Sequence, residues 1–153
     1  MNKIDFTIRK GEERDIPALM QHIHDLAEFE RMPEEVDVTT DTLLTDWKDH
    51  KAYDFLVAEI NDEVVGVSLY YPRYSTWKGR CFYLEDLIVQ PHLRGNGIGL
   101  ALLNATADEA RKAGAIRLDW QVLDWNEDAV RFYERIGAHI EKEWWNCKWR
   151  IDN

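Results

Sequence analysis

The sequence predicts a mixed α/β fold, in which helices cover the faces of a central sheet. Apolar residues alternate every second position in some segments and recur every three or four positions in others, which is typical of strands and helices. The first half is rich in hairpins, whereas strands and helices alternate in the second half. The length of 153 residues suits one core. We therefore expect one domain over residues 1–153.

The first half is predicted to hold a strand, two helices and a strand pair. Ile4, Phe6 and Ile8 alternate with polar residues, and Asp15 precedes a helix that has Pro17 in its first turn and runs to about Phe29. After a loop over 31–38, the remaining expected elements are a short helix capped by Thr39 or Thr40, strands over 55–60 and 64–71, and a loop over 72–79.

The second half is predicted to alternate strands and helices. Its expected elements are a strand over 81–89 that ends before Pro91, a helix over 98–112 closed by Gly114, a strand over 116–122, a helix between Asn126 and Gly137, and a Trp-rich strand over 143–151. The acidic pair Glu85-Asp86 interrupts the first of these strands. In a regular strand, Asp86 would point to the face opposite Glu85, and a bulge would undo that inference.

Charge narrows the classes of partner. Lys and Arg number 19 against 29 Asp and Glu, so the formal net charge is −10. Such a chain is a poor non-specific partner for nucleic acid or an anionic membrane, and it attracts small cations, although the charge also fits solubility alone. No apolar run approaches about 18 residues, and the N-terminus does not resemble a secretory signal. We expect no membrane segment and a cytoplasmic location.

The cysteines and histidines do not predict a metal site. Cys81 and Cys147 lie in separate strand-like segments without a C-x-x-C motif, so we expect two buried free thiols, as in a cytoplasmic protein. His22 and His24 are two residues apart, which places them on different faces of a helix. The expected metal content is none.

The most informative stretch is the glycine-rich segment before the helix over 98–112. Gly95, Gly97 and Gly99 expose backbone N–H groups where a strand ends and a helix begins, and Arg94 adds a cation. A helix start with unpaired N–H groups favours an anion such as a pyrophosphate. A glycine-rich turn without a ligand is the structural alternative.

The spacing of these glycines separates the known phosphate-binding motifs. The G-x-G-x-x-G fingerprint of dinucleotide-binding enzymes requires a glycine at Leu100, which disfavours an oxidoreductase, and the Walker A motif has no match. What fits is R-x-x-G-x-G, formed by Arg94, Gly97 and Gly99.

Together these motifs resemble the GNAT superfamily of N-acetyltransferases, and more closely its spermidine/spermine (diamine) acetyltransferase branch. Four stretches match that branch in order and spacing: Tyr83-Leu84-Glu85-Asp86, Arg94-Gly95-x-Gly97-Ile98-Gly99, Trp125-Asn126 and Phe132-Tyr133. Three others resemble the thialysine acetyltransferase member of the branch: Ala27-Glu28-Phe29-Glu30, the run from Tyr74 to Arg80, and the run from Val122 to Asn126. The resemblance covers roughly residues 4–152 and implies a mostly antiparallel mixed sheet whose central strands splay apart.

The resemblance implies an acetyl-CoA-dependent N-acetyltransferase that acts on a primary amine of a small cationic substrate. Transfer would be direct, through a tetrahedral intermediate, since neither cysteine lies in a motif that would activate a nucleophile. The residues implied to bind acetyl-CoA are Leu87, Ile88, Val89, Arg94, Gly95, Asn96, Gly97, Ile98, Gly99, Leu100, Asn126, Glu127, Asp128, Ala129 and Tyr133. No metal is required.

Two residues are implied to act in catalysis. Glu85 would hold the amine and accept its proton, directly or through water, because an aliphatic ammonium with a pKa of about 10.4 must be deprotonated before it attacks. Tyr133 would protonate the sulfur of the leaving CoA, although its spacing from Val130 and Ile136 also fits core packing.

The amine site is implied to contain Phe29, Glu30, Glu85, Asp119, Trp120 and Gln121. Spermine-using members carry an acid just before a Pro-Trp pair, where this chain has Ser75 before Thr76-Trp77. One acid fewer favours a thialysine- or lysine-like amine or a diamine over a long polyamine.

The C-terminal segment departs from the branch because it lacks the usual Glu-Gly-Trp. Trp144, Trp145 and Trp149 would either contact a second copy in a homodimer or fill a buried strand. Two other functions stay open: a non-catalytic acyl-CoA sensor, which would need neither Glu85 nor Tyr133, and a peptide or protein N-acetyltransferase on the same scaffold.

Overall fold

The computed structural model describes residues 3–152 and consists of two compact units, Met1–Gln121 and Val122–Asn153. The single domain expected over residues 1–153 stays a prediction. No helix among the described residues is long and apolar enough to cross a membrane.

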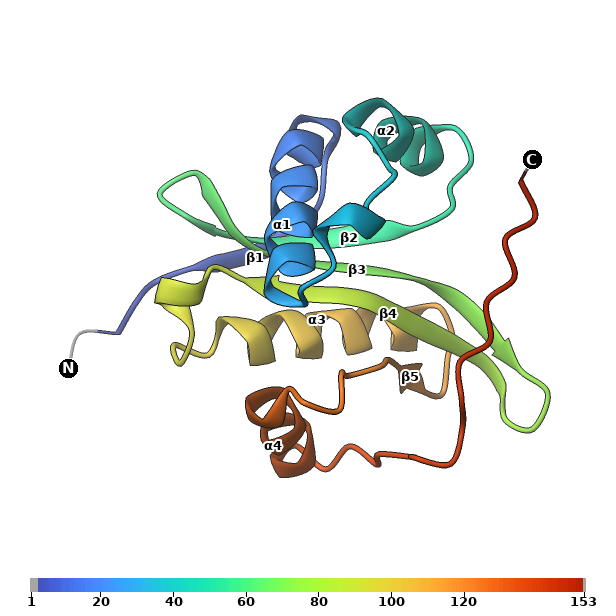
Figure 1. Cartoon of the computed structure of the whole chain (residues 1–153). Coiled ribbons are helices and arrows are strands. Elements are labelled where there is room, and N and C mark those ends of the chain that lie inside the picture. Colours follow the sequence, from blue (N-terminus) through green and yellow to red (C-terminus); the bar gives the residue numbers. More distant parts are fainter. Residues whose placement is uncertain (1–2, 153) are drawn as a thin grey trace. The chain divides into compact units, whose positions relative to one another are not determined.

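The first unit is built on a five-stranded mixed sheet (Figure 1). Its strands, in both chain and spatial order, are β1 (Thr7–Lys10), β2 (Asp54–Ile60), β3 (Glu63–Ser75), β4 (Gly79–Val89) and β5 (Leu118–Asp119). The first four strands pair antiparallel, and β5 pairs parallel with β4. The sheet is therefore mixed and mostly antiparallel, as predicted.

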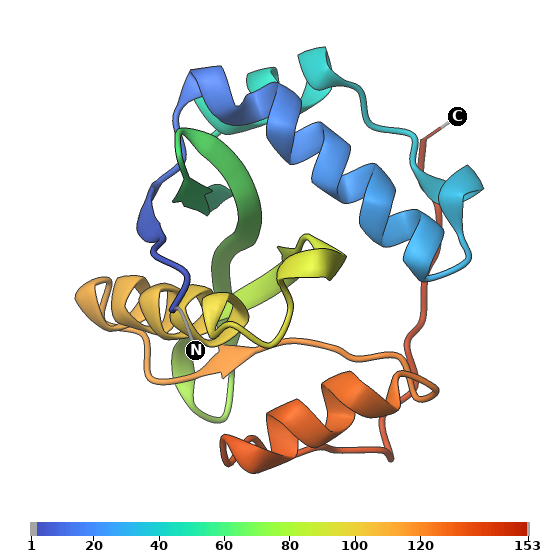
Figure 2. The ribbon, with the colours of Figure 1, turned by 90° about the vertical axis from the view of Figure 1, so that its left-hand side faces the viewer.

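Helices cover both faces of this sheet (Figure 2). On one face, α1 (Ile16–Phe29) and α2 (Thr40–Lys48) pack on β2, β3 and β4 through a buried core centred on Leu19 and Phe55. On the other face, α3 (Ile98–Lys112) contributes Ile98 and Leu102 to a second core. Short 3-10 helices occupy connections between these elements: η1 (Glu13–Asp15), η2 (Pro33–Glu35) and η3 (Pro91–Leu93).

The predicted helix starts are confirmed, but one of them is stabilised differently from expectation. Thr39 caps α2 by accepting a hydrogen bond from the Thr42 N–H at 3.1 Å. Asp15 makes no side-chain cap hydrogen bond. Its carboxylate instead accepts two hydrogen bonds from the Arg9 guanidinium, at 2.7 and 3.0 Å. Asp15 therefore joins β1 to the start of α1.

The loop expected over 72–79 is wrong, because β3 continues to Ser75 and β4 begins at Gly79. Proline was the misleading signal, since it cannot donate to a strand ladder. The last β2–β3 pair is Asp54↔Tyr70, so Pro72 lies where β3 has β4 alone as its neighbour. A missing N–H on that open side costs no hydrogen bond.

The strand over 116–122 is much shorter than expected, since only Leu118–Asp119 pairs with β4. Beyond Tyr83↔Asp119 the two strands no longer pair, which agrees with the expected splay.

The second unit contains α4 (Glu127–Arg135), which begins after Asn126 and ends near Gly137, as predicted. The strand expected over 143–151 is wrong: these residues form no strand, and no strand among the described residues pairs with them. Apolar alternation alone does not make a strand, which needs a hydrogen-bonded neighbour. The expectation of two buried thiols is also wrong, because Cys81 is buried but Cys147 is exposed.

Candidate active site

The glycine-rich loop lies between β4 and α3 and leaves the start of α3 open. Gly95 and Gly97 adopt φ values of 84° and 83°, which favour glycine. Gly97 is the N-cap of α3 and offers no side-chain cap, and the first turn of α3 contains no acid. Apart from each glycine and its two chain neighbours, no heavy atom of residues 3–152 lies within 4 Å of where a Cβ would stand at Gly95 or Gly97. The N–H groups of this turn can therefore reach an anion such as a phosphate.

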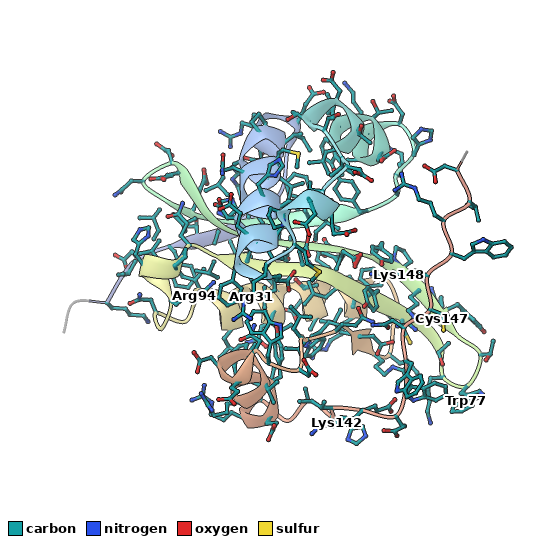
Figure 3. The ribbon with its side chains drawn as sticks, viewed as in Figure 1. Arg31, Trp77, Arg94, Lys142, Cys147 and Lys148 are labelled. Carbon is teal, nitrogen blue, oxygen red and sulfur yellow. The ribbon has the colours of Figure 1, made fainter. Side chains whose placement is uncertain are left out.

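The residues around these glycines hold the loop in place. The Asn96 side chain donates to the Leu93 carbonyl oxygen at 2.8 Å, and Ile98 is buried in the core under α3. Arg94 (Figure 3) lies with its guanidinium carbon 5.1 Å from the centroid of the Phe29 ring at the end of α1. This cation–π contact places the cation of the loop beside a residue predicted for the amine site.

The edge of β4 fits the expected role of Leu87, Ile88 and Val89. Their backbone pairs with β3 on one side, while the β4–β5 pairing ends at Tyr83. In the described part of the chain, no strand pairs with the other edge beyond that point. Their side chains pack into the two cores. An extended ligand arm with amide groups can therefore hydrogen-bond to this edge as another strand would.

A β-bulge in β4 changes the expected geometry of the acidic pair. Leu69 pairs with Asp86 and Tyr70 pairs with Leu84, so Glu85 has no Cα partner on β3. The regular alternation that would send the two carboxylates to opposite faces is broken. Burial raises the pKa values of the Tyr71 and Tyr83 phenols, and the negative charges of Glu85 and Asp86 raise them further. Asp86, which was not among the predicted site residues, therefore belongs to the same group as Glu85.

The environment of Asp86 suits a proton acceptor. Burial, together with the negative charges of Glu85 and Glu30, raises the pKa of the Asp86 carboxyl to about 7. Burial also raises the pKa of Glu30, at the C-terminal end of α1. Tyr71 and Tyr83 lie beside these acids with their ring centroids 5.6 Å apart. The structure thus brings Glu30, Glu85 and Asp86 together next to the aromatic pair of Tyr71 and Tyr83. These three acids are called the acidic cluster.

Asp119 has partners other than the acidic cluster. Arg117 donates to both of its carboxylate oxygens, at 2.6 and 3.2 Å, and an Arg73 nitrogen lies 3.6 Å from one of them. Its negative charge is therefore shared by two guanidinium groups. Trp120 is half-buried and Gln121 is exposed, directly after β5.

The remaining predicted site residues lie in the second unit. The Asn126 side chain caps α4 by accepting from the Ala129 N–H at 3.3 Å. The carboxylates of Glu127 and Asp128 pair with Arg131. Tyr133 is half-buried, and its ring centroid lies 5.4 Å from that of Phe132.

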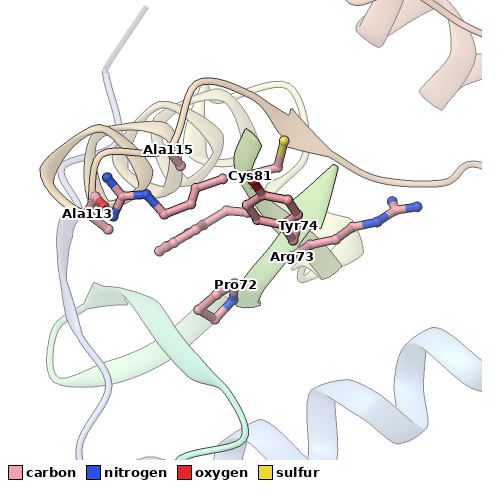
Figure 4. Close-up of a pocket in the computed structure, with 8 residues that line it drawn as sticks. Pro72, Arg73, Tyr74, Cys81, Ala113 and Ala115 are labelled. Carbon is pink, nitrogen blue, oxygen red and sulfur yellow. Dashed lines mark hydrogen bonds between the residues drawn. The ribbon is translucent and has the colours of Figure 1, made fainter. Parts of the chain in front are cut away.

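Two pockets in the first unit do not include the predicted site residues. One, of about 410 Å³, lies between the β3–β4 hairpin and the end of α3 (Figure 4). The other, of about 710 Å³, is lined by residues that include Lys10, Trp47 and Tyr70. Among residues 3–152, no group of three His, Cys, Asp or Glu side chains is arranged to hold a metal ion.

The family is decided by comparison with known proteins. Residues 17–138 match the Acetyltransferase (GNAT) family. The chain belongs to this family. It is therefore an acetyltransferase, and the resemblance seen in the sequence is confirmed.

The relatives fall in the expected branch. The chain is 39% identical to thialysine N-epsilon-acetyltransferase of Bos taurus, over 92% of this chain and 89% of that protein. It is 32% identical to spermidine/spermine N(1)-acetyltransferase-like protein 1 of Homo sapiens, over 87% of this chain and 20% of that protein.

The fold is shared with solved acetyltransferases. A metagenomic aminoglycoside acetyltransferase, crystallised with trehalose, superposes with a TM-score of 0.78 at 20% identity, over 96% of this chain and 97% of that chain. The likeness confirms the GNAT fold, which in the described residues is a mixed sheet of five strands with four α-helices.

Proposed function

We propose that this acetyltransferase transfers the acetyl group of acetyl-CoA to a primary amine of a small cationic substrate. The candidate substrates are a lysine-like amine such as thialysine, or a di- or polyamine, as the names of the two relatives suggest. The observation that carries the proposal is the acidic cluster, which lies in the same unit as the open glycine loop.

The residues at the start of α3 fit the anionic part of acetyl-CoA. The N–H groups at Gly97, Ile98 and Gly99 would donate to the pyrophosphate, and the Arg94 guanidinium would add a charge-assisted contact. The unpaired edge of β4 from Leu87 to Val89 would hydrogen-bond to the amides of the pantetheine arm. Acetyl-CoA, when bound, supplies the acetyl group as a thioester.

The acidic cluster would bind the amine and remove its proton. Glu85 and Glu30 supply negative charge that attracts an ammonium ion. Asp86 would accept the proton, since a carboxyl with a pKa of about 7 is matched to proton transfer near neutral pH. The amine nitrogen then forms a bond to the acetyl carbonyl carbon, and the carbon–sulfur bond breaks.

Tyr133 would return a proton to the sulfur, and Asn126 to Ala129 would lie near the cofactor. The family resemblance supports these roles. A phenol suits this step because its ordinary pKa of about 10 lets it donate a proton to a developing thiolate. The step consumes one amine and one thioester and yields one amide and one thiol.

The test is the release of free thiol from acetyl-CoA with thialysine, lysine, putrescine, spermidine and spermine. We expect amine-dependent release, and a fall in kcat of about 10²-fold in Tyr133→Phe. Tyr74→Phe makes the same change at an exposed tyrosine and should leave kcat unchanged. Tight acetyl-CoA binding without thiol release would favour the sensor, and release with peptides alone would favour a peptide acetyltransferase.

We also propose that the protein forms a homodimer in the cytoplasm. The side chains of Trp144, Trp145 and Trp149 are 67%, 90% and 90% exposed, which is unusual for tryptophan. Light scattering after gel filtration should give twice the monomer mass. Serine at Trp145 and Trp149 should return the monomer, and a monomeric wild type would contradict the proposal.

A further inference from the structure

Arg73 follows Tyr71 by two residues on β3. Its side chain therefore lies on the same sheet face as Tyr71 and Tyr83, the aromatic pair beside the acidic cluster. Arg73 belongs to the part of β3 that extends beyond β2, and its guanidinium carbon lies 5.2 Å from the centroid of the Tyr83 ring. The charges of Glu85, Asp86 and Arg73 all act on Tyr71 and Tyr83. These residues all belong to the first unit, Met1–Gln121. The aromatic pair is therefore within reach of both the two acids and the Arg73 cation.

The charge of Arg73 is only partly balanced by its neighbour Asp119. Arg117 already donates to both oxygens of that carboxylate. The Arg73 contact, at 3.6 Å, is longer than a hydrogen bond, and the Arg73 side chain is 54% exposed. In the close-up, Arg73 points away from Ala113 and the end of α3 (Figure 4). Its planar fork of N–H donors is therefore available to an incoming anion.

The spacing suits a substrate with opposite charges at its two ends. Asp86 pairs with Leu69 and Tyr83 pairs with Tyr71, two residues further along β3. Two strand residues span roughly 7 Å, and the guanidinium lies over the second of these pairs. An amine at the acidic cluster thus places the far end of a short extended aliphatic chain near Arg73.

We propose that Arg73 binds the carboxylate of an amino-acid substrate whose terminal amine lies at Glu85 and Asp86. Arg73 is then the residue that selects lysine-like amino acids over diamines and polyamines. A guanidinium pairs with a carboxylate through two parallel hydrogen bonds, whereas it repels the second ammonium of a diamine. The inference rests on the proposed function and narrows its substrate class.

The experiment compares two substrates that differ only in the carboxylate: lysine and 1,5-diaminopentane. We expect the wild type to have the higher kcat/KM for lysine. Arg73→Gln should lower the ratio of the two kcat/KM values about tenfold, through a higher KM for lysine, with kcat and the KM for acetyl-CoA little changed. The value for 1,5-diaminopentane should stay the same or rise. Arg73→Lys, which keeps the charge, should restore part of the preference.

The control is Arg111→Gln, which removes the same charge from an exposed arginine of α3 that pairs with Asp108. It should leave the ratio unchanged. The inference is overturned if the wild type does not prefer lysine, or if Arg73→Gln changes both substrates equally. In either case thiol release continues and the proposed function stands. If no amine supports thiol release, the proposed function fails and the role of Arg73 fails with it.

Discussion

The raised pKa of Asp86 predicts how catalysis depends on pH. With a pKa of about 7, its carboxyl loses its proton over the range in which the enzyme must work. We predict that kcat/KM for the amine rises with pH through about 7, as Asp86 becomes able to accept a proton. Asp86→Asn should lower kcat/KM about 10²-fold and remove that rise. A pH profile of both proteins measures this, and an unchanged profile in the variant would contradict the role.

The same pKa makes a prediction about stability. The ordinary pKa of an aspartate is 3.8 and that of folded Asp86 is about 7, so the folded state binds more protons between these values. The stability associated with Asp86 is therefore complete below pH 3.8 and is lost as the pH rises through about 7. Asparagine does not ionise. Asp86→Asn should melt several degrees above the wild type at pH 8 and at the same temperature as the wild type near pH 4.

The control for this stability prediction is Glu85→Gln. The Glu85 side chain is exposed, so its charge costs less free energy in the folded state than the buried charge of Asp86. Removing it should therefore raise the melting temperature less than Asp86→Asn does. If Asp86→Asn is less stable than the wild type at pH 8, the ionised carboxylate stabilises the fold. The raised pKa assigned to Asp86 would then be wrong.

The sequence pointed to individual site residues, but it did not show which residues would lie next to them in the fold. Glu85 was predicted from its position in an apolar strand, but the importance of Asp86 depends on a bulge, which residue alternation does not reveal. Arg73 was missed for a similar reason. It stands in a segment that looked like a loop after Pro72, and only the register of the β3–β4 hairpin brings it beside Tyr83.

Two glycines at the start of α3 allow the effect of backbone strain on stability to be measured separately from the effect on acetyl-CoA binding. Alanine at Gly97 would hold a φ of 83°, which costs an L-residue about 1–2 kcal/mol. Alanine at Gly99 is unstrained, since its Cβ would lie 3.8 Å from the nearest Val89 methyl. We predict that Gly97→Ala lowers the free energy of unfolding by about 1–2 kcal/mol and that Gly99→Ala leaves it within about 0.5 kcal/mol.

Both alanines add a methyl group to the proposed pyrophosphate cradle, so both should weaken acetyl-CoA binding. Urea denaturation measures the stabilities, and calorimetric titration with acetyl-CoA measures the binding. If Gly99→Ala binds as tightly as the wild type, the N–H groups of this turn are not the pyrophosphate site.

Elements defined by local signals were predicted well. α3 has the predicted bounds of residues 98–112, because its apolar face, its glycine start and its closing Gly114 are all local. The limits of β3, β5 and the 143–151 segment depend on which strand lies alongside, and that information is not local. Pro72 looked like a strand end, yet it lies where β3 has no partner on its β2 side.

At the scale of the whole molecule, the net charge of −10 acts on every cationic substrate. A diamine carries two positive charges, whereas lysine carries a net charge of one because of its carboxylate. Raising the ionic strength from about 20 to about 200 mM shortens the screening length from roughly 20 Å to roughly 7 Å. The long-range attraction is then lost, and the short contacts within the site remain.

We therefore predict that this rise in salt lowers kcat/KM several-fold for 1,5-diaminopentane and less for lysine, with kcat at saturating amine unchanged for both. Steady-state kinetics at constant pH and acetyl-CoA concentration measure how steeply kcat/KM falls with ionic strength for each of the two substrates. Equal slopes would mean that the field of the acidic surface does not reach the amine site. The acidic cluster alone would then account for cation binding.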